Sequence, residues 1–178
     1  MIPPVGITLI GPRAAGKTTL GRALATALGL QFVDTDAELG VRAGMSAGDF
    51  LRSAGEPAFR QLEEQVVLAA LAAADGSVIA LGGGALGRAT IRAELARPRL
   101  WTVFVHAPLA VLVERQRADG QRPGLTGLPL ADEVAMLWAS RLPAWRAVAD
   151  GEIDTGHQDV AAAVARLIDG WQHRRTGV

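Results

Sequence analysis

Short apolar runs alternate along this chain with longer segments in which apolar residues recur at helical spacing. Apolar, β-branched runs bounded by turn residues indicate strands, whereas apolar positions three and four residues apart indicate helices. The strands predicted in this way are 5–10, 31–34, 78–81, 101–105 and a weak one at 152–154. The predicted helices are 17–28, a small helix from 46, 57–74, 88–96, 108–118, 130–148 with a break at Pro143, and 159–171.

This alternation of strands and helices predicts the fold class. Strands that are joined through helices pair in parallel, and a parallel sheet is covered by helices on both faces. We therefore expect an α/β protein with three layers, α/β/α, in which residues 1–178 form one domain. Because ligands of such sheets gather beyond the carboxyl ends of the strands, functional residues are expected there.

The first predicted strand runs directly into a glycine-rich segment, residues 11–18, with the sequence GPRAAGKT. This segment matches the phosphate-binding P-loop, GxxxxGK[ST], and lies between a strand and a helix as that motif requires. The alternative is a glycine-rich turn with an incidental lysine. A P-loop binds phosphate through backbone N–H groups and a lysine, and Mg²⁺ through a hydroxyl. The predicted ATP-binding residues are Gly11, Pro12, Arg13, Ala14, Ala15, Gly16, Lys17, Thr18 and Thr19.

The use of basic residues sets Lys17 apart. It is the only lysine among the 18 lysine and arginine residues of the chain. A compact, mobile ammonium suits the phosphate slot of a P-loop, whereas the planar fork of arginine does not. The 18 basic residues are balanced by 18 acidic ones, so the net charge is zero and gives no overall attraction to nucleic acid or anionic membranes.

Composition also bears on the compartment. The chain has no cysteine, so it forms neither disulfides nor thiolate metal sites. Its N-terminal segment lacks the basic and long apolar regions of a secretory signal, and no apolar run approaches the length of a membrane span. We expect a cytoplasmic protein, and its size and neutral charge suit a monomer.

Two aspartates, Asp34 and Asp36, follow the second predicted strand. Residues two apart in an extended chain project to the same side, so both carboxylates would face the crevice beside the P-loop. One could bind Mg²⁺ through water, and the other could accept or orient a hydroxyl proton. The alternative is that one of them only caps the following helix. The neighbouring P-loop favours function.

Two arginines differ in how well helical spacing explains them. Arg60 has Glu56 and Glu64 four residues to either side, so a surface ion pair is the simplest interpretation from spacing alone. Arg141 instead lies in the middle of an apolar stripe that includes Trp138 and Trp145. An arginine there needs an anion, either a bound carboxylate or an internal acidic residue.

Segment 119–129 is rich in glycine and proline and reads as a mobile loop that contains Arg122. Packing does not explain this arginine, so a functional group and a solvated loop residue remain the two interpretations. Arg115, by contrast, is most simply part of the polar face of its helix.

Together these segments resemble shikimate kinase. The resemblance rests on the order and approximate spacing of six motifs: residues 11–18, 32–36 (FVDTD), Phe59-Arg60, Gly82-Gly83-Gly84, Arg122-Pro123 and Arg141. It covers about residues 7–154, and 122–130 is especially similar to one bacterial form of the enzyme. Trp145, where a tyrosine is usual nearby, and Gly124, where a larger residue is common, depart from the family.

The resemblance implies ATP-dependent phosphorylation of the 3-hydroxyl of shikimate in the chorismate pathway of aromatic amino acid biosynthesis. It implies a nucleoside-monophosphate-kinase-like fold with strand order 2-3-1-4-5, a substrate-binding region at about 34–62 and a lid at about 119–130. The implied roles are Thr18 and Asp34 for Mg²⁺, Asp36 as base, Arg60, Gly82, Gly83, Gly84 and Arg141 for shikimate, Arg115 on adenine, and Lys17 and Arg122 on the phosphates.

Two other functions compete with this interpretation. One is a different small-molecule kinase on the same scaffold, such as a gluconate or nucleoside monophosphate kinase. The chain lacks the Asp-Gly-Phe-Pro-Arg type of segment found in adenylate kinases, and its acceptor-side residues suit a small hydroxy acid. The other is a nucleotide-binding regulator without transfer activity, which the complete set of expected polar groups disfavours.

Overall fold

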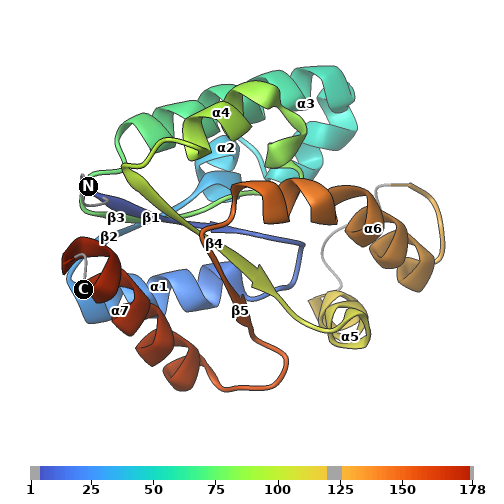
Figure 1. Ribbon diagram of the computed structural model, residues 1–178. Coiled ribbons are helices and arrows are strands. Elements are labelled where there is room, and N and C mark those ends of the chain that lie inside the picture. The colour runs from blue at the N-terminus through green and yellow to red at the C-terminus, as the bar shows by residue number, and fades with distance from the viewer. Residues whose placement is uncertain (1–4, 120–125, 177–178) are drawn as a thin grey trace.

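A central sheet between two layers of helices is the main feature of the computed structural model, which describes residues 5–119 and 126–176 (Figure 1). The strands are β1 (Gly6–Ile10), β2 (Gln31–Asp34), β3 (Ser77–Ala80), β4 (Leu100–His106) and β5 (Gly151–Asp154). They pair in parallel in the order β2-β3-β1-β4-β5. This confirms both the α/β class and the strand order that the resemblance implied.

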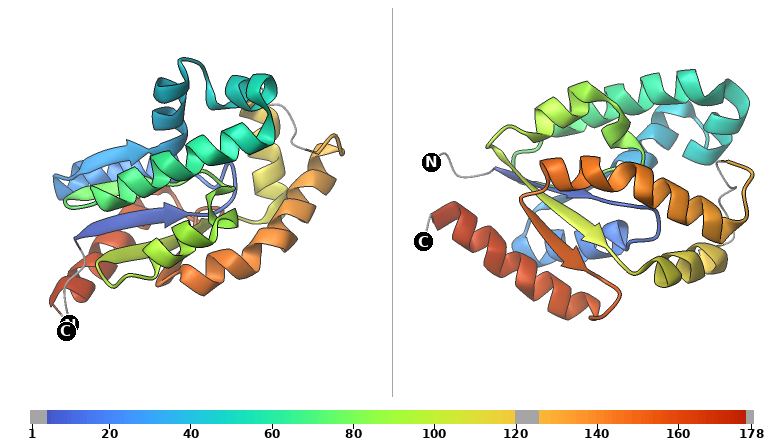
Figure 2. Two further views of the ribbon diagram at one scale, coloured as in Figure 1. Left: turned by 90° about the horizontal axis from the view of Figure 1, so that it is seen from above. Right: turned by 45° about the vertical axis from the view of Figure 1, so that its right-hand side comes forward.

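The helices are divided between the two faces of the sheet (Figures 1 and 2). One face is covered by α1 (Lys17–Leu28) and α7 (Val160–Thr176). The other is covered by α3 (Ala47–Ala72), α4 (Ala89–Leu95) and the second half of α6 (Leu130–Val148). The remaining elements are α2 (Thr35–Ala43), α5 (Leu109–Asp119) and the short 3₁₀ helix η1 (Ala85–Gly87).

The core is divided in the same way because neighbouring strand residues point to opposite faces. Leu9 of β1 packs in the cluster beneath α1 and α7, which includes Trp171. Ile10, the next residue, packs in the opposite cluster with Leu71 and Trp145. Burial on both faces explains why the central strands are continuous apolar runs in the sequence.

Local signals account for several helix ends. Gly29 ends α1 in the left-handed conformation, and the Ser46 hydroxyl caps α3 by accepting a hydrogen bond from the Asp49 amide. The helix expected from Pro57 is continuous with the small helix before it except at Gly55, whose φ of 80° breaks the helical path. Pro57 therefore lies in the first turn after the break, where its missing N–H costs little.

The break expected at Pro143 is wrong, since α6 runs through this residue as one helix. Trp138 and Trp145 lie on either side of Pro143, and their rings pack on Phe104 with centroid separations of 6.0 and 5.5 Å. Packing of both halves on the same strand residue keeps them in line despite the lost hydrogen bond.

None of the helices within residues 5–119 and 126–176 combines the length and the apolar character that crossing a bilayer requires.

Candidate active site

The P-loop connects β1 to α1 and is held close to β4. Gly11 has a φ of 138°, and a Cβ built on it would lie 2.0 Å from the Val105 carbonyl oxygen, so only glycine fits. Gly16 caps α1 in the left-handed region, and the first turn of α1 contains no acidic residue. The positive end of the α1 dipole is therefore open to an anion.

The Lys17 ammonium lies over this loop. Its Nζ donates to the carbonyl oxygens of Gly11 at 2.9 Å and Pro12 at 2.7 Å. Both distances are typical of hydrogen bonds. These bonds hold the lysine against the loop that is expected to bind phosphate.

A pocket of about 720 Å³ opens beside the P-loop, a volume typical of small-molecule sites. Six of the nine predicted ATP-binding residues at 11–19 line it: Arg13, Ala14, Gly16, Lys17, Thr18 and Thr19. The other three predicted residues belong to the loop but do not line the pocket: Gly11, Pro12 and Ala15. Asp34, Asp36, Gly83 and Arg115 come to the same pocket from other elements.

The two carboxylate oxygens of Asp34 contact different elements, the start of α2 and the first turn of α1. Its Oδ1 accepts hydrogen bonds from the amides of Asp36 at 3.0 Å and Ala37 at 3.4 Å, which caps α2. Its Oδ2 accepts from the Thr18 hydroxyl at 2.7 Å. The capping interpretation is therefore confirmed for Asp34, whose other oxygen contacts the P-loop threonine, and its functional role stays a prediction.

Asp36 lies in the first turn of α2, not in an extended segment, so the expected strand-like projection of the pair is wrong. The cap made by Asp34 starts the helix one residue after the strand ends. Both carboxylates nevertheless line the P-loop pocket, because the turn brings Asp36 back to the same side.

A second pocket adjoins the first and shares Arg13, Asp36 and Gly83 with it. Its volume is about 90 Å³. Arg60, Glu63, Gly84 and Arg141 complete its polar wall, and Leu51 and Phe59 give it an apolar side. Predicted residues from five separate segments thus meet in one small cavity.

Arg60 and Glu63 form the ion pair of this pocket. Arg60 Nη1 lies 2.7 Å from Glu63 Oε2, and Nε lies 3.4 Å from the exposed Glu56. The predicted partner Glu56 is confirmed, whereas Glu64 pairs with Arg88 instead. Burial lowers the pKa of Arg60, but the neighbouring glutamates, Glu63 above all, raise it overall. Burial dominates at Glu63 and raises its pKa although Arg60 opposes this.

Arg141 reaches this pocket from α6. Its Nη1 donates to the Gly83 carbonyl oxygen at 3.2 Å, and within the described part of the chain it forms no ion pair with a carboxylate. Burial, followed by the charge of Arg60, lowers its pKa. Two neighbouring guanidiniums with one buried partner carboxylate make an attractive site for a further anion.

Gly82 is pressed against the acidic groups of the site. A Cβ built there would lie 2.6 Å from Asp36 Oδ1 and 3.1 Å from Glu63 Oε1. We expect Gly82→Ala to displace these carboxylates and reduce kcat/KM by about 10- to 100-fold, as small misplacements in active sites do. Steady-state kinetics check this. Gly87→Ala is the control, since a Cβ at Gly87 meets nothing within 4 Å; equal kinetics for the two variants would contradict the prediction.

Glu63 is a site residue that the sequence reasoning missed. It is only 4% exposed and lies on the apolar stripe of α3 with Phe59 and Val66. Its spacing of four and three residues from these neighbours was a readable signal, because an acidic residue on a buried stripe needs a partner.

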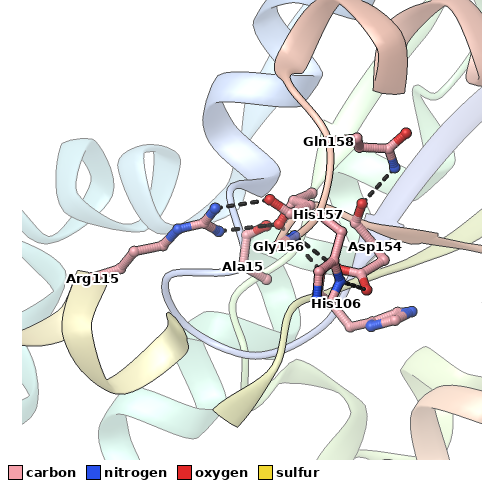
Figure 3. Close-up of polar contacts among 8 residues, drawn as sticks. Ala15, His106, Arg115, Asp154, Gly156, His157 and Gln158 are labelled. Carbon is pink, nitrogen blue, oxygen red and sulfur yellow. Dashed lines mark hydrogen bonds and ion pairs between the residues drawn. The ribbon is translucent and has the colours of Figure 1, made fainter. Parts of the chain in front are cut away.

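Arg115 also lines the P-loop pocket, but hydrogen bonds fix its guanidinium (Figure 3). Nη1 donates to Thr155 Oγ1 at 3.1 Å and Ala14 O at 3.3 Å, and Nη2 donates to Thr155 O at 2.9 Å. Thr155 is a second neighbour of the site that the sequence reasoning missed. Arg122 and Gly124 lie outside the described residues.

The sheet order and the strand–loop–helix phosphate site place the protein among P-loop kinases with the nucleoside-monophosphate-kinase-like fold. A family model described as shikimate kinase matches residues 13–171.

Relatives and solved structures agree with that match. A shikimate kinase of Thermobifida fusca is 42% identical over 89% of this chain and 91% of its own length, and one of Mycobacterium tuberculosis is 39% identical over 90% and 89%. The structure of shikimate kinase from Acinetobacter baumannii in complex with shikimate superposes with a TM-score of 0.88 at 30% identity, covering 98% of this chain and 96% of that one. The chain belongs to the shikimate kinase family.

Proposed function

We propose that the protein transfers the γ-phosphoryl group of ATP to the 3-hydroxyl of shikimate, a step toward chorismate and the aromatic amino acids. The observation that carries this proposal is the junction of the two pockets, where Asp36, Arg13 and Gly83 line both. An acceptor in the smaller pocket and a triphosphate in the larger one meet there, as in-line transfer requires.

The acceptor pocket offers groups for each part of shikimate. Arg141 and Arg60 suit its carboxylate, because guanidinium and carboxylate pair through two hydrogen bonds. Asp36 lies at the junction and is the candidate base, or orienting group, for the reacting hydroxyl. Gly83 and Gly84 line the same pocket, and Gly82 precedes them. A Cβ at Gly82 would collide with Asp36 and one at Gly84 with Arg60, so only glycine lets the backbone approach these side chains.

The nucleotide side requires charge compensation, which we assign to Lys17 and to Arg122 of the lid at about 119–130. The Thr18 hydroxyl and the Asp34 carboxylate are hard oxygen donors 2.7 Å apart beside Lys17, and this pair fits Mg²⁺. A bound Mg²⁺ would neutralise charge on the phosphates. We infer that a monomer with one kinase domain is sufficient for activity, since a single chain supplies polar groups for both substrates.

The direct test is mass spectrometry of the product after incubation with Mg-ATP and shikimate. We expect shikimate 3-phosphate and ADP in equal amounts. Gluconate and nucleoside monophosphates in parallel reactions test the competing acceptors, and phosphorylation of one of these in place of shikimate would overturn the proposal. ATP binding without any product would instead indicate a nucleotide-binding regulator.

Arg141→Ala tests the carboxylate-binding role. Loss of a charged hydrogen-bond partner is expected to raise the KM for shikimate by about 10- to 100-fold, with a much smaller effect on the KM for ATP. Arg146→Ala is the matched control, because Arg146 is exposed on the same helix and lines neither pocket. An equal rise in both constants for Arg141→Ala would count against a carboxylate site.

A further inference from the structure

Thr155 lies where the P-loop, α5 and the end of the sheet meet. Its amide donates to the His106 carbonyl oxygen at 2.8 Å, which fixes its backbone beside β4. Its hydroxyl lies 2.9 Å from Ala15 O and 3.1 Å from His106 O, and it accepts a hydrogen bond from Arg115 at 3.1 Å. Figure 3 shows the Arg115 guanidinium pointing toward the loop that carries Ala15.

The bonding capacity of the hydroxyl decides between its two possible acceptors. A threonine hydroxyl has one hydrogen and can serve one carbonyl at a time. The Ala15 oxygen is nearer, and the His106 oxygen already accepts from the Thr155 amide. We therefore assign the hydroxyl hydrogen to a bond with the Ala15 carbonyl oxygen, while the Thr155 oxygen accepts a hydrogen bond from Arg115.

The two contacts restrain successive peptide groups of the P-loop. Arg115 Nη1 donates to Ala14 O at 3.3 Å, and the Thr155 hydroxyl donates to Ala15 O. In a planar trans peptide the carbonyl and the following N–H point in opposite directions. Holding these oxygens on the side of Thr155 and Arg115 turns the amides of Ala15 and Gly16 the other way.

The restraint acts at the residue of the loop whose backbone conformation is least favourable. Ala14 has a φ of 61° and is the only residue other than glycine at positive φ in the described part of the chain. Such a conformation persists only when surrounding contacts enforce it. Arg115 and Thr155 supply two of those contacts, and both also line the P-loop pocket.

We propose that Thr155 is a positioning residue for nucleotide binding, which acts with Arg115 to hold the P-loop amides in their phosphate-binding orientation. This rests on the proposed function in taking ATP as the ligand of the loop. Thr155 acts through the loop and not on the reacting atoms. One hydroxyl and one guanidinium thereby connect the P-loop to the segment that follows β5 and to α5.

Thr155→Val removes the hydroxyl while keeping the side-chain shape. We expect the Kd for ADP, measured by isothermal titration calorimetry, to rise about fivefold to tenfold, in line with the loss of one or two hydrogen bonds. The KM for ATP should rise similarly, with the KM for shikimate unchanged. Thr155→Ser retains the hydroxyl and is expected to bind ADP within about twofold of the unaltered protein.

Thr102→Val is the matched control. Thr102 is fully buried in β4, and its hydroxyl has no hydrogen-bond partner among the described residues, so this variant loses a hydroxyl without losing the bonds at issue. Thermal melting of all variants separates a folding defect from a binding defect.

Three outcomes would overturn the proposal. They are an unchanged Kd for ADP in Thr155→Val, a serine variant as weak as the valine variant, and equal weakening by Thr102→Val. ADP binding is measured without turnover, so these results are independent of whether the unaltered protein forms shikimate 3-phosphate, which tests the proposed function alone.

Discussion

Replacing Lys17 with alanine is expected to lower kcat by about 10²- to 10³-fold, the usual cost of removing one preorganised charged group from a transition state. The ammonium lies 2.9 and 2.7 Å from two carbonyl oxygens of the P-loop, within the nucleotide-sized pocket. Charge that accumulates on the phosphate oxygens during transfer would lose this cation. Coupled detection of ADP with saturating substrates measures the effect.

Two further variants show what the lysine contributes. Lys17→Arg keeps the charge but introduces a planar fork, and we expect it also to be severely impaired because the slot suits a compact ammonium. Arg22→Ala removes an exposed cation from the same helix and should leave kcat nearly unchanged. Circular dichroism should show an intact fold in all three. Near-normal turnover by Lys17→Ala would refute the P-loop assignment.

Asp36→Asn is expected to lower kcat by about 10²- to 10⁴-fold, the range for loss of a general base. The substitution keeps the side-chain volume but removes the negative charge, and with it the ability to accept and hold a proton. Among the described residues Asp36 is the one carboxylate that lines both pockets, so in the proposed reaction it would face the nucleotide and the acceptor together. The KM for ATP should change little, because the P-loop itself is not altered.

Glu38→Gln provides the comparison for Asp36→Asn. Glu38 is an exposed acidic residue in the first turn of the same helix, so both variants remove a similar interaction with the α2 dipole. A loss of activity specific to Asp36→Asn supports a role at the reacting hydroxyl. If both variants reduced kcat equally, stability of α2 and not proton transfer would explain the effect.

The fold could be predicted well because its signals are local. Continuous apolar strands, the glycine at the end of α1 and the Ser46 cap each act through neighbouring residues. The error at Pro143 has a different origin. Trp138 and Trp145 pack on Phe104, a residue distant in sequence, and local propensity carries no information about such contacts.

The site was predictable where a motif links residue type to a local turn, as in the P-loop, and less so elsewhere. Glu63 was missed because Arg60 already had two acidic neighbours at helical spacing, and the one signal for Glu63 as a further partner is its place on the buried stripe of α3. Thr155 contacts Ala15 across 140 positions of sequence. No periodicity reports a bond of that kind, so the structure was needed to find it.

Because both carboxylate oxygens of Asp34 form hydrogen bonds, a mutation at this position has two structural effects. One oxygen anchors the start of α2, which carries Asp36, and the other meets the Thr18 hydroxyl. Any change at Asp34 would mix lost metal affinity with a shifted α2, and a single rate constant could not apportion the two. Thr18→Val is the cleaner probe of metal dependence, because among the described residues the Thr18 hydroxyl hydrogen-bonds to Asp34 alone.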